Sequence, residues 1–178
     1  EAGRMKKLVE NLLFLARSDA KSTPMLYSTF SFSHLILGCL LTFEPVAFEQ
    51  GVMIEDEISD DIFISGDAPQ IRQLVAILLD NACKYCLEFV EITARQTDKE
   101  LIIMIDDDGP GIPESKRELI FRRGQRIDTL RPGQGLGLAL VDELLQQYDG
   151  EAIITDSHLG GARMSIHFGR QQVSHAVD

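Results

Sequence analysis

The stretch Asp106-Asp107-Asp108-Gly109-Pro110-Gly111-Ile112-Pro113 is the segment around which the predicted fold is organised. The apolar run at 101–105 leads into it and predicts a buried strand. A carboxylate at the end of such a strand can accept a hydrogen bond from an exocyclic amine. The glycines that follow let the backbone approach a flat ring where a Cβ atom would clash. The alternative is an acidic turn that only ends a strand, because acidic Gly-Pro turns are common.

Composition limits the classes of function open to the chain. Its 178 residues, 44% of them hydrophobic, suffice for one compact domain with its own core. It carries 17 Lys and Arg against 28 Asp and Glu, a net charge of −11. This balance argues against a basic surface for nucleic acid, although a nucleotide pocket needs only local positive charge.

The three cysteines, Cys39, Cys83 and Cys86, argue against a disulfide scaffold and fit a reducing cytoplasm. We expect the pair in Cys83-Lys84-Tyr85-Cys86 to pack a helix rather than to bind zinc or act in redox chemistry. We find no apolar run that approaches the roughly 20 residues of a membrane span. The chain itself is therefore expected to make no direct membrane contact.

Periodicity predicts strands at 27–32, 52–58, 62–65, 89–94, 101–107, 151–155 and 162–168, and helices at 34–50, 68–85, 114–120 and 136–148. The second and third strands are expected to form a hairpin, and so are the fourth and fifth. This mixed order, without a strict βαβ repeat, favours an α+β fold. We expect a two-layer α/β sandwich with helices on one face of a mixed, mostly antiparallel sheet.

Punctuating residues set the expected helix boundaries. Ser33 is expected to cap the first of these helices, Pro45 to kink or restart it, and Gly51 to end it in the left-handed conformation. Asp67 is expected to cap the long helix that follows.

The ends of the chain are expected to lie outside this domain. Residues 4–18 predict an amphipathic helix whose apolar stripe needs a missing partner helix or a second copy, the alternative being its own domain. We therefore divide the chain into a helical segment at 1–20, a linker at 21–26, a domain at 27–170 and a flexible tail at 171–178.

Two further segments carry groups suited to a nucleotide. Asn81, Lys84 and Tyr85 share one helix face, and they offer an amide oxygen for Mg²⁺, a cation for phosphate and a ring to cover a sugar or base. The sequence Arg131-Pro132-Gly133-Gln134-Gly135-Leu136-Gly137-Leu138 opens a helix, and free amides at a helix start bind anions. Its spacing matches neither a Rossmann fingerprint nor a Walker loop.

These segments, with Phe121 and Gly160-Gly161, occur in one order between residues 81 and 161. In this order they resemble the asparagine box and the glycine and phenylalanine boxes of the ATP-binding domain of sensor histidine kinases, within the GHKL ATPase group. The resemblance covers most of the chain, loosely in its first half, where residues 1–20 resemble the second helix of the family's dimerisation domain. It implies the Bergerat ATP-binding fold.

The resemblance also implies roles for individual residues. Asp107 would bind the adenine amine, and 114–131 would be a mobile lid. Catalytic roles fall on Asn81, Lys84, Arg126, Arg131 and Gln134, and Mg²⁺ ligation falls on Asn81 and Gln134. Contacts to ATP fall on Asn81, Lys84, Tyr85, Asp107, Gly109, Gly111, Ile112, Arg126, Arg131, Gly133, Gln134, Gly135, Leu136, Gly137 and Leu138.

The implied activity is transfer of the γ-phosphoryl group of ATP to a histidine outside this chain, and from there to a response regulator receiver domain. The partners would be the chain's own dimerisation and phosphoacceptor domain and that receiver domain. The parent would be a homodimeric bacterial inner-membrane protein with this part in the cytoplasm. None of His34, His158, His167 and His175 has the context of the family's phosphoacceptor, so we expect no self-phosphorylation.

One departure from the family's pattern leaves an alternative open. Ile77 stands one helical turn before Asn81, where histidine kinases usually carry a second Asn and the ATP-hydrolysing relatives a Glu. Ile cannot ligate a metal or activate water, so metal affinity is expected to be weakened and hydrolysis is disfavoured. The alternative function is a nucleotide-gated protein-interaction module with little catalysis.

Overall fold

The structure is a computed structural model that describes residues 27–60, 62–97, 99–122, 124, 135–169 and 173–174. The predicted helix at 4–18 and the predicted linker at 21–26 lie outside it.

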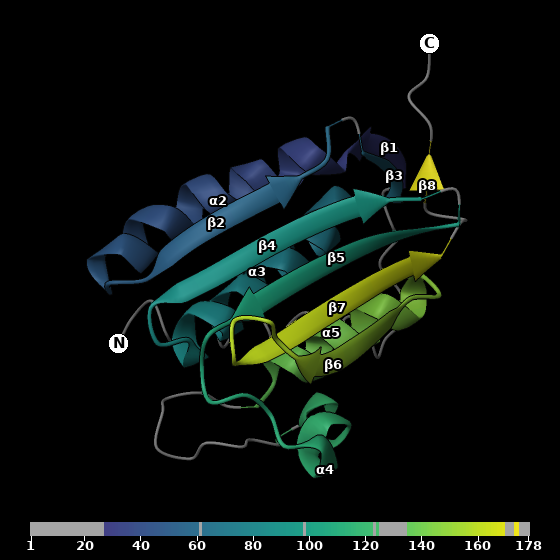
Figure 1. Ribbon diagram of the computed structural model, residues 1–178. Coiled ribbons are helices and arrows are strands. Elements are labelled where there is room, and N and C mark those ends of the chain that lie inside the picture. Colours follow the sequence, from purple (N-terminus) through teal and green to yellow (C-terminus); the bar gives the residue numbers. More distant parts are fainter. Residues whose placement is uncertain are drawn as a thin grey trace.

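A five-stranded sheet forms one layer of the molecule (Figure 1). Its strand order is β2 (Met53–Ile58), β4 (Phe89–Gln96), β5 (Glu100–Asp107), β7 (Ala162–Gly169) and β6 (Glu151–Asp156). β2 runs parallel to β4, and all other neighbours are antiparallel. A second, antiparallel sheet joins β1 (Ser28–Ser31), β3 (Phe63–Gly66) and β8 (Val173–Ser174).

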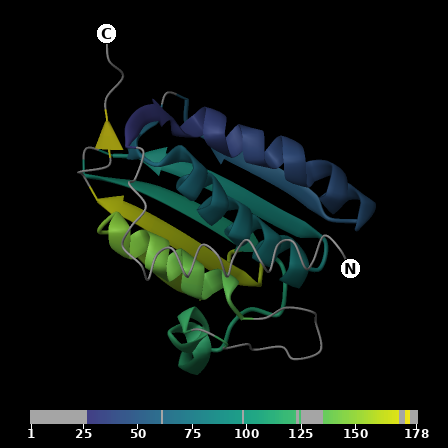
Figure 2. The ribbon, with the colours of Figure 1, turned by 180° about the vertical axis from the view of Figure 1, so that it is seen from behind.

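Three long helices cover one face of the larger sheet and leave the other face open (Figures 1 and 2). They are α2 (Phe32–Glu49), α3 (Ala68–Tyr85) and α5 (Gly137–Gln147). The short helices α4 (Glu114–Arg117) and η1 (Leu119–Phe121) follow β5 and lie beyond one end of the sheet. The predicted α+β fold, a mixed sheet with helices on one face, is confirmed.

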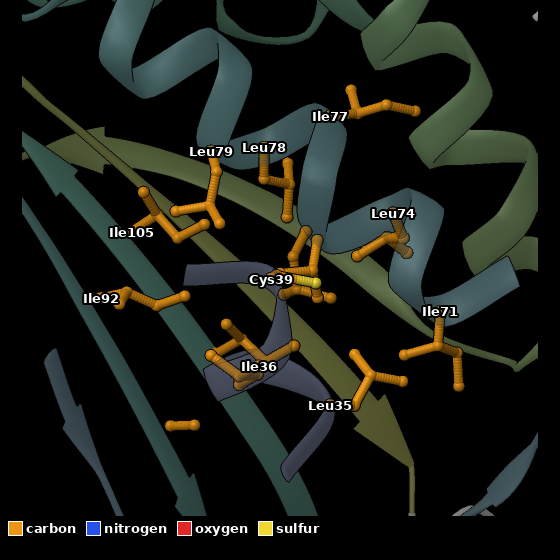
Figure 3. Packing of buried hydrophobic residues seen from close by; sticks show 14 of the residues in the cluster. Leu35, Ile36, Cys39, Ile71, Leu74, Ile77, Leu78, Leu79, Ile92 and Ile105 are labelled. Atoms are coloured by element: carbon orange, nitrogen blue, oxygen red, sulfur yellow. The ribbon is translucent and has the colours of Figure 1, made fainter. Parts of the chain in front are cut away.

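The core lies between this sheet and its helices. Side chains alternate along a strand, so every second residue of β4 and β5, such as Ile92 and Ile105, points toward the helices. Figure 3 shows Ile92 near Ile36 of α2, and Ile105 near Leu78 and Leu79 of α3. Each large apolar side chain buried in this way stabilises the fold by about 1.5–3 kcal/mol.

The predicted hairpin between 52–58 and 62–65 is wrong. The two strands belong to different sheets, since β2 pairs with β4 and β3 pairs with β1 and β8. The short connection between them closes on the start of α2 instead. Ser33 Oγ donates to Ser59 O at 2.9 Å and accepts from Ile62 N at 3.1 Å.

That use of Ser33 also corrects the predicted cap of α2. Ser31 is the N-cap, and its side chain accepts from the backbone N–H of His34 at 3.2 Å. The helix starts at Phe32, whose side chain is fully buried, and Ser33 Oγ already bonds Ser59 O and Ile62 N. Pro45 lies inside a helix that runs on to Glu49, and Gly51 follows it with a φ of +76° as expected.

The expectation that the sequence holds no run long and apolar enough to span a membrane is wrong for α2. This helix has 18 residues with a mean hydropathy of 1.3, which is sufficient by length and composition alone. In this fold α2 is a core helix, because Phe32, Leu35, Ile36, Cys39 and Leu40 pack into the interior.

The other expected boundaries agree with the structure. The Asp67 side chain caps α3 by accepting from Gln70 N at 3.2 Å, and β4 and β5 form the expected hairpin. The cysteines are free, and burial raises the pKa of Cys83 to about 11, which keeps this thiol neutral.

Tyr148 joins the end of α5 to the start of α3. Its ring is fully buried, and its hydroxyl accepts from Asp67 N at 3.1 Å. Burial raises the pKa of Tyr148 to about 12, so the hydroxyl stays neutral at physiological pH.

We expect Tyr148→Phe to lower the free energy of unfolding by about 1–3 kcal/mol, because a buried N–H loses its acceptor. Urea denaturation measures the change. Tyr27→Phe is the control, since this half-exposed ring lies 6.1 Å from that of Tyr148, and it should change stability by less than about 0.5 kcal/mol. Equal stability of Tyr148→Phe and the parent chain would contradict the assigned role.

Candidate functional site

The three consecutive carboxylates at the end of β5 point in different directions. Asp107 follows the inward alternation of Ile103 and Ile105 and lies on the helix side of the sheet. Asp106 points to the open face. Asp108 follows the strand, and its Oδ1 accepts from Leu87 N at 2.8 Å, in the loop after α3.

Asp107 is held by backbone amides from two segments. Its Oδ1 accepts from Gly109 N at 2.9 Å and from Ala162 N, at the start of β7, at 3.1 Å. The residue is only 8% exposed, and burial raises the pKa of its carboxyl group although these two hydrogen bonds oppose the shift. No described residue donates to Oδ2, which leaves this oxygen able to accept a proton donor from a ligand.

The hydrogen bonds to Asp107 require that neighbouring positions carry no Cβ atom. A Cβ atom on Gly161 would lie 2.2 Å from Asp107 Oδ1, and one on Gly109 would lie 2.3 Å from Tyr85 O. A Cβ atom on Gly111, whose φ is +71°, would lie 3.4 Å from Gly161 O. The end of β5, the end of α3 and the β6–β7 turn therefore meet at Asp107.

The last turns of α3 carry the predicted polar face. Lys84 and Tyr85 are half-buried, and Lys84 Nζ lies 5.1 Å from the centre of the Tyr85 ring. The Asn81 amide nitrogen is buried and has no acceptor within the described part of the chain. Buried polar groups almost always have a partner, so this orphaned amide fits a site that takes an acceptor from a ligand.

The second glycine stretch reaches the same helix one turn earlier. Ile77 is 6% exposed, and a Cβ atom on Gly137 would lie 3.1 Å from its Cγ2. α5 begins at this contact with no side-chain cap from Leu136, so its first amides are open to an anion. The side chains of Leu136 and Leu138 are partly buried and pack against the core.

The middle of the predicted lid is joined to a residue that follows it. Gly124 N donates to Gly135 O at 3.0 Å, and both residues have positive φ, +77° and +67°. Earlier in the same segment, Arg117 donates from Nε to Ile112 O at 2.9 Å and forms an ion pair with Asp156 of β6. Arg126, Arg131, Gly133 and Gln134 lie outside the described residues, and their roles stay predictions.

Sequence reasoning missed the part of the site supplied by the β6–β7 turn. It identified Gly160-Gly161 as a glycine box but assigned no contact to Gly161, and it did not consider the Ala162 amide. The glycine doublet was the available signal in the sequence. In the structure Gly161 does not have a positive φ, so the reason for glycine at this position is the close approach of other atoms.

A family model described as "Histidine kinase-, DNA gyrase B-, and HSP90-like ATPase" matches residues 66–172. The chain belongs to this family. Sensor protein PhoQ of Escherichia coli strain K12 is 58% identical over 122 residues, which are 68% of this chain and 25% of the relative. The virulence sensor histidine kinase PhoQ of Salmonella typhimurium is 59% identical over the same shares. The chain thus spans about a quarter of the length of these relatives.

Solved structures agree on the fold. Full-length ShkA in complex with AMPPNP matches with a TM-score of 0.84 and 25% identity, over 97% of this chain and 37% of that one. The mycobacterial sensor histidine kinase MprB matches with a TM-score of 0.73 and 24% identity, over 84% and 99%. The family and fold expected from the sequence are confirmed, and the matches support an ATP-binding catalytic domain of a two-component histidine kinase.

We expect Gly161→Ala to destabilise the protein by about 1–3 kcal/mol or more, because its methyl group would displace the Asp107 carboxylate. Gly38→Ala is the matched control. It lies within α2, where the nearest atom is the flexible Arg72 Nη1 at 3.3 Å, and gains helix propensity worth about 1 kcal/mol. Thermal unfolding compares the two, and equal effects would contradict the close approach.

Proposed function

We propose that this chain binds Mg-ATP as the catalytic domain of a sensor kinase and transfers its γ-phosphoryl group to a histidine, from which the group passes to a response regulator. The observation that carries the proposal is the Asp107 carboxylate. Two backbone amides hold its Oδ1 and leave Oδ2 for the exocyclic amine of adenine, beside the end of the helix that bears Asn81.

The base would lie at the junction of β5, α3 and the β6–β7 turn. Gly109 and Gly111 would give its flat ring access to the backbone, and the Tyr85 side chain would cover the sugar. The raised pKa of Asp107 supports this role, because a carboxylate that is costly to bury is stabilised by the donor that a ligand brings.

The phosphates would lie between the polar face of α3 and the open start of α5. Lys84 supplies a cation, and an oxygen of the phosphate chain would satisfy the buried Asn81 Nδ2 while Asn81 Oδ1 ligates Mg²⁺. When bound, the ion neutralises charge on the β- and γ-phosphates. Ile77 offers no ligand atom, so we expect Asn81 to be the metal ligand that α3 supplies. Gln134 is the second proposed ligand.

The segment 114–131 would act as the lid. The hydrogen bond between Gly124 N and Gly135 O ties its middle to the chain just before α5, and Arg117 attaches its first helix to β6. Arg126 and Arg131 would then reach the phosphates from the intervening loop. Positive charge there would stabilise the transferred group.

The sensor-kinase relatives also suggest the setting of the domain. We infer that residues 1–20 belong to a dimerisation and phosphoacceptor helix and that 27–170 form the catalytic domain. The parent protein would be a homodimer anchored in the bacterial inner membrane, with this domain in the cytoplasm and the receiver domain of a response regulator as partner.

The Asp107→Asn variant tests the assignment of the base site. We expect ATP affinity to fall about 10–100-fold, because a hydrogen bond to a charged acceptor is lost, and calorimetry measures it. At pH 7 the ATP-free variant should be more stable than wild type by about 0.5–2 kcal/mol, because a buried charge is removed.

The pH dependence of that gain follows from the raised pKa. Asp107 favours the fold when protonated, and this contribution is lost as pH rises through the folded-state pKa. The stability gain of Asp107→Asn should therefore disappear near pH 4 and below, where the wild-type carboxyl group is also neutral. Unchanged ATP affinity at pH 7 would contradict the proposed function.

Removal of the metal tests the role of Asn81. Chelation by EDTA should weaken ATP binding to wild type but change binding to Asn81→Ala little, because that variant has already lost its α3 ligand. Phosphoryl transfer from labelled ATP to a separately supplied phosphoacceptor domain should fall by about 100-fold or more in the variant. Exposed Gln147→Ala is the control, and an equal EDTA effect in Asn81→Ala would exclude Asn81 as ligand.

A further inference from the structure

The open face of the sheet carries a buried carboxylate directly behind the proposed base site. Asp106 is 1% exposed although none of the described helices lies on this side of its strand. Ser157 Oγ donates to its Oδ1 at 2.7 Å, and Arg163 Nε donates to Oδ1 at 2.9 Å and to Oδ2 at 3.0 Å. Each carboxylate oxygen therefore has a donor.

His158 extends this group to β4. Its Nδ1 lies 3.2 Å from Arg163 Nη2, and its Nε2 lies 3.2 Å from Glu91 Oε2. The same Nδ1 lies 3.5 Å from Asp106 Oδ1. Because a guanidinium only donates, Nδ1 accepts in the contact with Arg163, and in that tautomer Nε2 donates to Glu91. We call Glu91, Asp106, Ser157, His158 and Arg163 the outer-face cluster.

A metal ion is a poor occupant of the outer-face cluster. Glu91, Asp106 and His158 offer ligand atoms within 4.8 Å of one another. The Arg163 guanidinium already binds both oxygens of Asp106, and its charge opposes a second cation at this place. The geometry points instead to a network that fastens one segment to another.

The fastened segment is the β6–β7 turn, which also holds the base site. Ser157 and His158 contribute to the outer-face cluster, and Ser157 N donates to Gly161 O at 2.9 Å across the turn. From its other side Gly161 N donates to Asp107 O at 3.1 Å, and Ala162 N donates to the Asp107 carboxylate. One turn is thus held by two adjacent residues of β5 that point to opposite faces.

We propose that the outer-face cluster positions the Asp107 carboxylate and so determines selectivity for adenine. Asp106, Ser157 and Arg163 are positioning residues that dock the turn on the end of β5. The docked turn then presents Gly161 and the Ala162 amide to Asp107 at fixed positions. If the turn is released, Asp107 loses one of its two donors and its orientation toward the base. This inference rests on the proposed function, since it assumes that Asp107 binds the adenine amine.

Base selectivity gives a readout that a general loss of stability does not change. Inosine carries a carbonyl oxygen where adenosine has its exocyclic amine, so the ratio of the dissociation constants for ITP and ATP reports on Asp107. Calorimetry below the unfolding temperature measures both constants for wild type, Asp106→Asn and the milder Ser157→Ala. We expect the ratio to fall about threefold to tenfold in each variant, the effect of one weakened hydrogen bond to a charged group.

Glu100→Gln is the matched control. Glu100 Oε2 lies 2.9 Å from His167 Nδ1 on the same open face, at the opposite end of β5 from Asp106. This variant changes a carboxylate contact on the same face that is more exposed and remote from the turn, and it should keep the wild-type ratio.

The outcomes separate this inference from the function on which it rests. A wild-type protein that binds no ATP, or binds ITP equally well, would overturn the proposed base site itself. If wild type prefers ATP and both variants keep its ratio, the positioning role is wrong and the proposed function stands. A parallel loss of affinity for ATP and ITP, with the ratio unchanged, would also overturn the inference, because it indicates a structural role alone.

Discussion

The arrangement of this domain depends on one ionisable group held by the backbone. The Asp107 carboxylate accepts from the amides of Gly109 and Ala162 in a place where burial raises its pKa. The contact is possible because positions 109 and 161 carry no Cβ atom, so that three chain segments approach within one hydrogen-bond length. Such a site is costly without a ligand and becomes favourable when a donor arrives, which is what ligand recognition requires.

Strand alternation gives the neighbouring residue a different task. Asp107 faces the helices and the proposed nucleotide, and Asp106 faces the open side of the sheet. Both hold the β6–β7 turn, one through backbone amides and the other through Ser157 and Arg163. The end of a strand can in this way hold a loop through contacts on both of its faces. Contacts on one face then oppose a movement that would break the contacts on the other.

The sequence allowed the fold class, most elements and the central acid of the site to be predicted, for reasons that the structure makes clear. The β4–β5 hairpin joins strands close in sequence, and its alternation identifies the buried face. The partner of β2 could not be predicted in this way, because alternation shows which face of a strand is buried but not which strand lies beside it. The prediction of the residue that caps α2 was wrong for a related reason. Ser31 and Ser33 are both competent caps, but the Ser33 hydroxyl is bonded to Ser59 and Ile62, which are distant in sequence.

The site shows the same division between local and distant information. Asp107 and its glycines form a contiguous motif, whereas the donors to Asp106 come from Ser157 and Arg163, more than 50 positions later. No local pattern links residues so far apart. The predicted roles of Asn81 and Lys84 depended on helical spacing, which the structure keeps, but the orphaned Asn81 amide is visible only after α3 is packed.

Ile77 places two requirements of the site in competition. Its buried side chain meets Gly137 where α5 begins, and this apolar contact sets how closely the open helix start approaches α3. An amide at position 77 would offer a second metal ligand but would bring a polar group into that apolar contact. The residue present at position 77 therefore suits the close contact between α3 and the start of α5.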